Sequence, residues 1–418
     1  MLYYKKTVLD NGLTILSENV SSVHSISLGF WFQVGSRDEL EAEAGMSHFN
    51  EHMMFKGTPS IDAQMLSEKF DRLGARQNAF TSKEATCYYA DFIDESLPEI
   101  FKVMSDMVLN ASMEQDQCVL EREVVIEEIA RSEDDPEDIA YELFCKSLWP
   151  HHTLGLPVAG TRKSVGSFGS KEALAYHRKH YNAKNCTIVA AGNVNHDELV
   201  ELAFKYLGDM PEGEQANDAL RNAPKSFAHG QFNYTKDTEQ AHIFMGGPSL
   251  SMRDDRRYAY TMANFIFGGS MSSRLFQEVR EKLGLVYSVY SLLNPYTDAG
   301  FFAVYAGTRP ENTEKVVEVV RRELEKYAQG KITEDDRELA LNAIKGNLAL
   351  GLESTSQRMR TLGASYLARK EAFSYEETVK RYENVTLEMV HEAAFDIAAC
   401  DKVLALVGAF DQDYRIEA

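Results

Sequence analysis

Short apolar runs and amphipathic helical stretches are interspersed along the first half of the chain. Runs rich in apolar and β-branched residues predict strands at residues 14–17, 26–34, 86–92 and 187–191. Ser112 and Gln115 are spaced as in a capping box, which predicts a helix that continues to the acidic turn before Pro136. Because the strands and helices are mixed and do not alternate strictly, the pattern favours the α+β class.

The second half repeats the pattern of the first at a constant offset of 216 residues. Three segments match in the same order and without gaps: Arg37-Asp38 with Arg253-Asp254, helical residues 100–108 with 316–324, and strand residues 187–192 with 403–408. A constant offset of this kind predicts an internal duplication. We therefore expect two homologous α+β domains, each a mainly antiparallel β-sheet packed with α-helices.

A polar stretch separates the two repeats. It runs from Glu212 through Pro224 and has no apolar periodicity, which is typical of a linker. The expected organisation is an N-terminal domain over residues 1–211, a linker over 212–228 and a C-terminal domain over 229–418.

Charge and composition narrow the classes of function. The 418 residues carry a formal charge of −20, which repels phosphates and disfavours binding to nucleic acid or to an anionic membrane surface. We see no secretory signal and no run of about 18 apolar residues that would span a membrane. The five cysteines are scattered without a C-x-x-C pair, as in reduced cytoplasmic proteins. The expected location is the cytoplasm.

The candidate chemistry lies between Gly45 and Gly57. His48 and His52 are four residues apart on a predicted short helix, so both imidazoles project from one face and can hold one ion. Glu51 lies at the edge of that face. A zinc peptidase needs neutral nitrogen ligands, a third ligand and a carboxylate that takes a proton from water, and H-x-x-E-H supplies two ligands and the base.

The third ligand is expected on the acidic helix predicted over residues 114–131. Its carboxylates at Glu121 and Glu128 are seven residues apart and share a face. Spacing alone does not choose between Glu127 and Glu128, and an acidic helix of this kind is also typical of a solvated surface.

The motif and this helix together resemble the inverted-motif zinc peptidases, and more narrowly the pitrilysin and mitochondrial processing peptidase family in its short bacterial, two-domain form. In that family the ligand glutamate closes the pattern E-R-x-V-x-x-x-E, which is Glu128 here. The resemblance thus implies one Zn²⁺ per chain, held by His48, His52 and Glu128. It also implies that Glu121 is an additional acidic residue near the metal. The strand at Asn78 and Ala79 would bind an extended peptide by strand addition.

The second repeat lacks the metal residues, since His48, Glu51, His52 and Glu128 fall on Asn264, Phe267, Gly268 and Ile344. The resemblance assigns Arg280 and Tyr287, seven residues apart, to contacts with substrate near the scissile bond. It further implies a homodimer, because one chain carries both the zinc motif and this pair.

The sequence therefore predicts a zinc endopeptidase that acts on extended peptides or unfolded segments. The alternative is a catalytically silent scaffold or peptide-binding subunit of the same fold, for which a retained Glu51 has no purpose.

Overall fold

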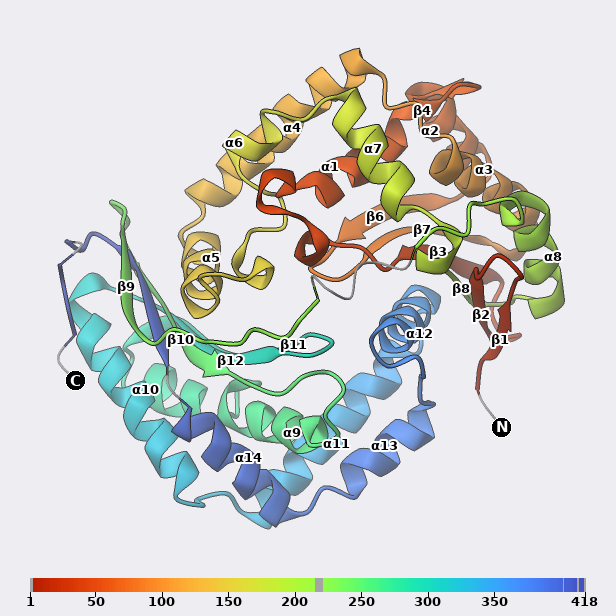
Figure 1. Ribbon diagram of the computed structural model, residues 1–418. Coiled ribbons are helices and arrows are strands. Elements are labelled where there is room, and N and C mark those ends of the chain that lie inside the picture. The colour runs from red at the N-terminus through yellow and green to blue at the C-terminus, as the bar shows by residue number, and fades with distance from the viewer. Residues whose placement is uncertain (1–2, 215–220, 401, 412, 417–418) are drawn as a thin grey trace. The chain divides into compact units, whose positions relative to one another are not determined.

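The computed structural model describes residues 3–214, 221–400, 402–411 and 413–416 (Figure 1). It contains two compact units that interleave along the sequence. The first comprises residues 1–130, 156–222 and 350–374, and the second comprises residues 131–155, 223–349 and 375–418. The expected linker, 212–228, includes the passage between the units at Asn222 and Ala223. Its residues 215–220 lie outside the described part of the chain.

The first unit is built on a six-stranded sheet in the order β1-β2-β8-β3-β7-β6. The pair β2–β8 is parallel and the other pairs are antiparallel. The strands are β1 (Lys5–Val8), β2 (Thr14–Asn19), β3 (Ser25–Phe32), β6 (Arg76–Thr81), β7 (Thr86–Ile93) and β8 (Cys186–Gly192). A separate short hairpin pairs β4 (Gly57–Thr58) with β5 (Ile61–Asp62). Four of these strands match the strands expected from the sequence.

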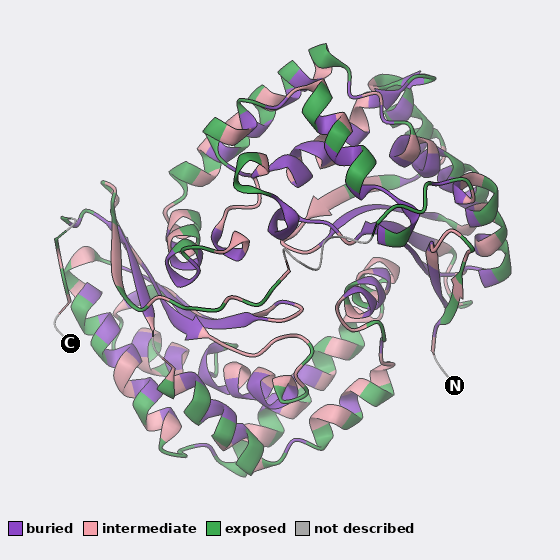
Figure 2. Cartoon of the chain, viewed as in Figure 1, coloured by how far each residue is buried: buried purple, intermediate pink, exposed green. Residues whose placement is uncertain are grey.

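Alternating side chains of this sheet form two cores, because successive residues of a strand point to opposite faces. On one face, Phe30 and its neighbours pack with residues from most of the unit's helices. On the other, Trp31 packs with Met359 and Leu362 of α12 (Thr355–Arg369). The central strand β8 is buried throughout, and its neighbour β3 is buried except at Ser25 (Figure 2). The remaining helices are α1 (Met46–Met53), α2 (Ala63–Arg72), α3 (Leu97–Leu109), α4 (Gln115–Asp134), α6 (Arg162–Val165), α7 (Ser170–His180) and α8 (His196–Leu207).

The second unit repeats this topology, which confirms the duplication. Its sheet has the order β11-β12-β10-β13-β9, again with one parallel pair, β13–β9. The strands β2 and β3 begin at residues 14 and 25, and β9 and β10 begin at 230 and 241, so both pairs keep the offset of 216. The strands are β9 (Gly230–Thr235), β10 (Ala241–Pro248), β11 (Val286–Pro295), β12 (Gly300–Thr308) and β13 (Val403–Gly408).

Two helices do not follow the expected division of the chain into domains 1–211 and 229–418, because each packs in the unit formed mainly by the other domain's residues. Helix α12 belongs to the first unit, whereas α5 (Pro136–Leu148) belongs to the second and packs on the face of its sheet that carries Phe244 and Phe301. The opposite face of that sheet packs against α9, α10 and α14. The other elements of the second unit are α9 (Arg257–Gly268), the π-helix η7 (Phe276–Lys282), α10 (Thr313–Ala328), α11 (Glu334–Gly351), α13 (Tyr375–Glu383) and α14 (Leu387–Ala399).

Two further expectations concern thiols and membranes. All five cysteines are free thiols, and four of them are buried. Within the described ranges, no helix combines the length and the apolar character that a membrane span requires.

Candidate metal centre

The two histidines of the motif lie on α1, as the sequence predicts. The buried side of this helix includes Phe49 and Met53, which anchor it to the core of the first unit. This anchoring turns His48, Glu51 and His52 to the partly exposed side. The helix ends in a 3-10 turn before Gly57, whose positive φ of 102° suits glycine.

Helix α4 brings one carboxylate to both imidazoles. The Oε2 of Glu128 lies 3.6 Å from Nε2 of His48 and 3.5 Å from Nε2 of His52, and the two Nε2 atoms are 3.3 Å apart. Among the described residues these three side chains form the one group with metal-ligand spacing, whereas the exposed Glu127 is outside it. The structure thus places Glu128, of the two carboxylates that spacing left open, beside the histidines.

The separations of these three atoms fit a zinc ion. Bonds of about 2.0–2.2 Å in a tetrahedral site put neighbouring ligand atoms about 3.3–3.6 Å apart. The three observed separations fall in that range, so the side chains fit the ion without rearrangement. Two imidazoles and one carboxylate leave a fourth tetrahedral position, which is the ligand set typical of catalytic zinc.

The protonation of His48 suits a metal ligand. Burial, and to a smaller extent the charge of the neighbouring His52, lowers its pKa to about 4. The ring is therefore neutral at pH 7 and offers a lone pair. Its Nδ1 is buried and has no hydrogen-bond partner.

Glu121 orients the second imidazole. Its Oε1 lies 2.8 Å from Nδ1 of His52, so an Nδ1–H donates to this carboxylate and leaves Nε2 free as a ligand. Burial lowers the pKa of His52, but the hydrogen bond and charge of Glu121, together with Glu51 and Glu128, outweigh it and raise the pKa. The pKa of Glu121 is lowered: burial acts to raise it, and the bonds from His52 and Lys56 prevail.

Glu51 is held separately from the ligands. Burial raises its pKa, against a hydrogen bond that the hydroxyl of Thr81 donates to its Oε2. A carboxylate with a raised pKa and a fixed orientation suits the role of a general base. Thr81 is the last residue of β6, so this bond also fixes that strand beside α1.

The predicted peptide-binding residues lie on a free sheet edge. Asn78 and Ala79 belong to β6, the terminal strand of the six-stranded sheet, which pairs on one side only, with β7. Among the described residues no strand pairs with its other side, which is the kind of edge to which a strand can add, although the amide of Ala79 already donates to Oδ1 of Asn78 at 2.8 Å.

The structure brings Arg280 and Tyr287 together in the second unit. Arg280 lies on η7 and Tyr287 on β11, and the guanidinium carbon is 5.6 Å from the centre of the phenol ring. Tyr287 is 76% exposed. None of the equivalents of the metal residues in this unit is a histidine or a carboxylate, and one of them, Phe267, packs against Phe302 and Tyr327 in its core.

Three residues of the site were not predicted from the sequence. Thr81 bonds Glu51, and Lys56 forms an ion pair with Glu121. Glu39 is buried and accepts hydrogen bonds of 2.7 Å from the backbone amides of Gly45 and Ser47, at the start of α1. Lys56 lies four residues after His52, in the 3-10 turn that follows α1, and this closeness in sequence was a usable signal, whereas Glu39 and Thr81 reach α1 through turns that local patterns do not specify.

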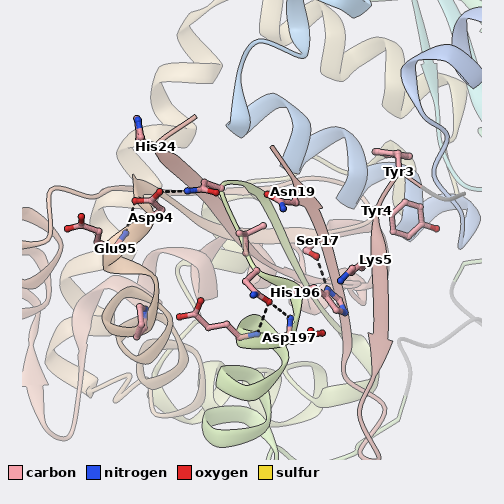
Figure 3. Close-up of a pocket in the computed structure, with 15 residues that line it drawn as sticks. Tyr3, Tyr4, Lys5, Ser17, Asn19, His24, Asp94, Glu95, His196 and Asp197 are labelled. Carbon is pink, nitrogen blue, oxygen red and sulfur yellow. Dashed lines mark hydrogen bonds between the residues drawn. The ribbon is translucent and has the colours of Figure 1, made fainter. Parts of the chain in front are cut away.

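A cavity of about 1250 Å³ in the first unit is a weaker candidate (Figure 3). Several of its polar side chains are already hydrogen-bonded: His196 contacts Ser17 at 2.7 Å through Nδ1 and, outside the lining, Thr7 at 2.9 Å through Nε2. Asn195 caps the start of α8, and Asn193 donates to Asp94. These groups are already satisfied, so the cavity offers less chemistry than the group at His48.

Comparisons with known proteins match both halves of the chain. A family model described as insulinase (peptidase family M16) matches residues 14–162, and one described as the peptidase M16 inactive domain matches residues 167–344. An uncharacterized zinc protease of Streptomyces coelicolor is 38% identical over 97% of this chain and 89% of its own length. The uncharacterized zinc protease YmxG of Bacillus subtilis is 36% identical over 96% of this chain and 98% of its own length.

Solved structures share the fold. A protease from Helicobacter pylori aligns with a TM-score of 0.89 at 21% identity, covering 97% of this chain and all of that one. A Pseudomonas fluorescens structure described as a peptidase M16 inactive domain aligns with a TM-score of 0.89 at 20% identity over the full length of both chains.

Proposed function

This chain belongs to the insulinase family of peptidases, M16, and from that premise we propose that it is a zinc-dependent endopeptidase that hydrolyses extended peptides or unfolded segments. The observation that carries the proposal is the ligand triangle of His48, His52 and Glu128, whose edges match those of a tetrahedral zinc site. A zinc ion bound there supplies a Lewis acid that polarises a water molecule and the scissile carbonyl.

The side chains of the protein would bind the metal, orient one of its ligands and transfer the proton. His48, His52 and Glu128 are the proposed ligands, one ion per chain, and Glu121 keeps the Nε2 of His52 directed at the site. Glu51 accepts the proton of the attacking water and returns it to the leaving amine. Its raised pKa and its hydrogen bond from Thr81 support this role.

Substrate binding is assigned to two places. The free edge of β6 at Asn78 and Ala79 would hold an extended peptide through backbone hydrogen bonds, which is the mode of β-strand addition. Arg280 and Tyr287 would donate hydrogen bonds to a substrate carbonyl or to the developing oxyanion. We further propose a cytoplasmic homodimer, in keeping with one chain carrying both sets of residues.

Cleavage of a quenched-fluorescent peptide library tests the proposal. We expect activity that a chelator removes and that zinc restores, with one equivalent of zinc per chain. The alternative, a silent scaffold or peptide-binding subunit, requires a folded, zinc-loaded protein that cleaves no member of the library. That result would overturn the proposed activity.

A further inference from the structure

The edge strand β6 has one face toward the metal centre and one face toward α12. Thr81 and Ala79 point to the side of α1, where Thr81 bonds Glu51 and Ala79 packs on the main core. Phe80 points to the opposite side and packs with Trp31. A peptide paired with β6 places each of its side chains on the same face as the β6 residue opposite it. The peptide residue opposite Phe80 therefore faces α12.

One cation of α12 covers this end of the sheet. The guanidinium carbon of Arg360 lies 5.5 Å from the ring centre of Phe80 and 4.6 Å from that of Tyr89. Its Nη2 also donates to the hydroxyl of Tyr89. Tyr89 is paired with Asn78, so the guanidinium lies over the part of β6 to which a peptide would add.

Among the described residues, no carboxylate is paired with Arg360. It forms no ion pair there, and its Nε is buried without a hydrogen-bond acceptor. Arg358, two residues earlier, differs in this respect because it is paired with Glu18. A half-buried cation that contacts only aromatic rings and one hydroxyl retains donors for an anion, since guanidinium presents five N–H groups.

The backbone of α12 packs closely against the sheet, and this fixes the point from which the side chain of Arg360 extends. A Cβ on Gly363 would lie 2.5 Å from the Trp31 ring, and one on Gly29 would lie 2.6 Å from Sδ of Met359. The approach at Gly363 requires glycine, because the Trp31 ring is rigid, whereas at Gly29 the end of the Met359 side chain would have to move. These close approaches hold the helix at the distance at which Arg360 reaches the rings of β6 and β7.

We propose that Arg360, stacked on Phe80 and Tyr89, is a specificity-determining residue that binds an aspartate or glutamate side chain of the substrate. That side chain belongs to the peptide residue opposite Phe80. The inference rests on the proposed function, because it assumes that a peptide adds to β6. A carboxylate gains charge-assisted hydrogen bonds from the guanidinium, and its neutral amide isostere loses most of this gain. The net charge of −20 repels acidic peptides at long range, so the acidic residue is expected at this one position and not throughout the substrate.

The test compares peptides that differ only by Glu, Gln or Lys, scanned through each position of a cleaved parent peptide. At one position the wild type should favour Glu over Gln by about 10- to 100-fold in kcat/KM. Arg360→Gln should abolish that preference while leaving the Gln peptide nearly unaffected, and Arg360→Glu should reverse it in favour of Lys. Arg72→Glu, the same charge change on an exposed face of α2, is the matched control and should leave the preference intact.

Binding of the same peptides to the Glu51→Gln variant, measured by fluorescence anisotropy, separates this inference from the proposed function. Selective binding of the Glu peptide that depends on Arg360, without any cleavage by the wild type, would support the subsite and overturn the peptidase. Cleavage with equal preference for Glu and Gln at every position would overturn the subsite and leave the peptidase standing. Loss of the Glu preference in Arg72→Glu as well would also overturn the proposed subsite, because the net charge of the protein, and not Arg360 in particular, would then explain the preference. Absence of both binding and cleavage would overturn both.

Discussion

The Nδ1 of His52 lies 2.8 Å from Oε1 of Glu121, and this contact ties the geometry of one metal ligand to a residue that does not touch the ion site. The carboxylate fixes the ring's tautomer and orientation and increases the basicity of Nε2. It is itself held by Lys56, so the orientation of His52 depends on a chain of three side chains from α1, α4 and the 3-10 turn that follows α1.

Glu121→Gln should therefore weaken zinc binding by about 10- to 100-fold while the protein stays folded. Competition with a chromogenic chelator at pH 8 measures this, because protons compete less for His52 at pH 8 than at neutral pH. In the metal-free protein, the pKa of His52 followed by NMR should fall, since Glu121 is the largest contribution that raises it. An unchanged pKa and unchanged zinc affinity would show that Glu121 does not orient the ring.

The third ligand is tested by two neighbouring substitutions. Glu128→Gln should reduce zinc retention much more than Glu127→Gln, because only Glu128 reaches both imidazoles. Metal content after gel filtration in a mild chelator compares the two variants. Greater loss in Glu127→Gln would mean that the α4 register at the metal is one residue away from that in the structure.

Glu39 at the start of α1 predicts a pH dependence of stability. Burial raises its pKa to about 7, against the amides of Ser47 and Gly45, which lower it. A raised pKa stabilises the folded state fully below the unfolded value of 4.5, and this contribution is lost as pH rises through 7. Relative to Glu39→Gln, the wild type should thus lose about 3 kcal/mol of unfolding free energy between pH 4.5 and pH 8.

Urea denaturation of the metal-free proteins at several pH values measures this difference. The exposed neighbour Glu41 provides the control, since Glu41→Gln should show no comparable pH-dependent difference from the wild type. A difference in unfolding free energy between the wild type and Glu39→Gln that stays constant across these pH values would contradict the raised pKa of Glu39.

Arg280 is expected to act on substrate and not on the metal. Arg280→Ala should keep full zinc content and lower kcat by about 10-fold or more, as expected for a lost oxyanion donor. Steady-state kinetics beside metal analysis checks both halves of the statement. Wild-type kinetics would reduce Arg280 to a surface residue that stacks on Phe276 and Tyr287.

Local pattern was sufficient for much of the fold. The runs rich in apolar and β-branched residues located β2, β3, β7 and β8, and the offset of 216 predicted the second sheet, because a duplicated chain keeps its hydrophobic pattern when its chemistry is lost. The spacing of His48 and His52 predicted a shared helical face because the relative direction of two side chains four residues apart is set by about one turn of helix.

Contacts between distant segments were not predicted. Nothing in the periodicity of α12 indicates that it packs on the sheet of the first repeat, or that α5 packs on that of the second. The same limit applies to Glu39 and Thr81, whose roles depend on where turns direct the chain. Spacing also left Glu127 and Glu128 equivalent, since the choice depends on how α4 is rotated against α1.

The most direct test of the central claim is turnover by Glu51→Gln beside the wild type, with zinc content and melting temperature measured on the same samples. The substitution removes the proposed base and leaves His48, His52 and Glu128 in place. We predict equal zinc, a similar melting temperature and at least a 100-fold loss of peptide cleavage. Undiminished cleavage by a zinc-loaded Glu51→Gln protein would contradict the mechanism.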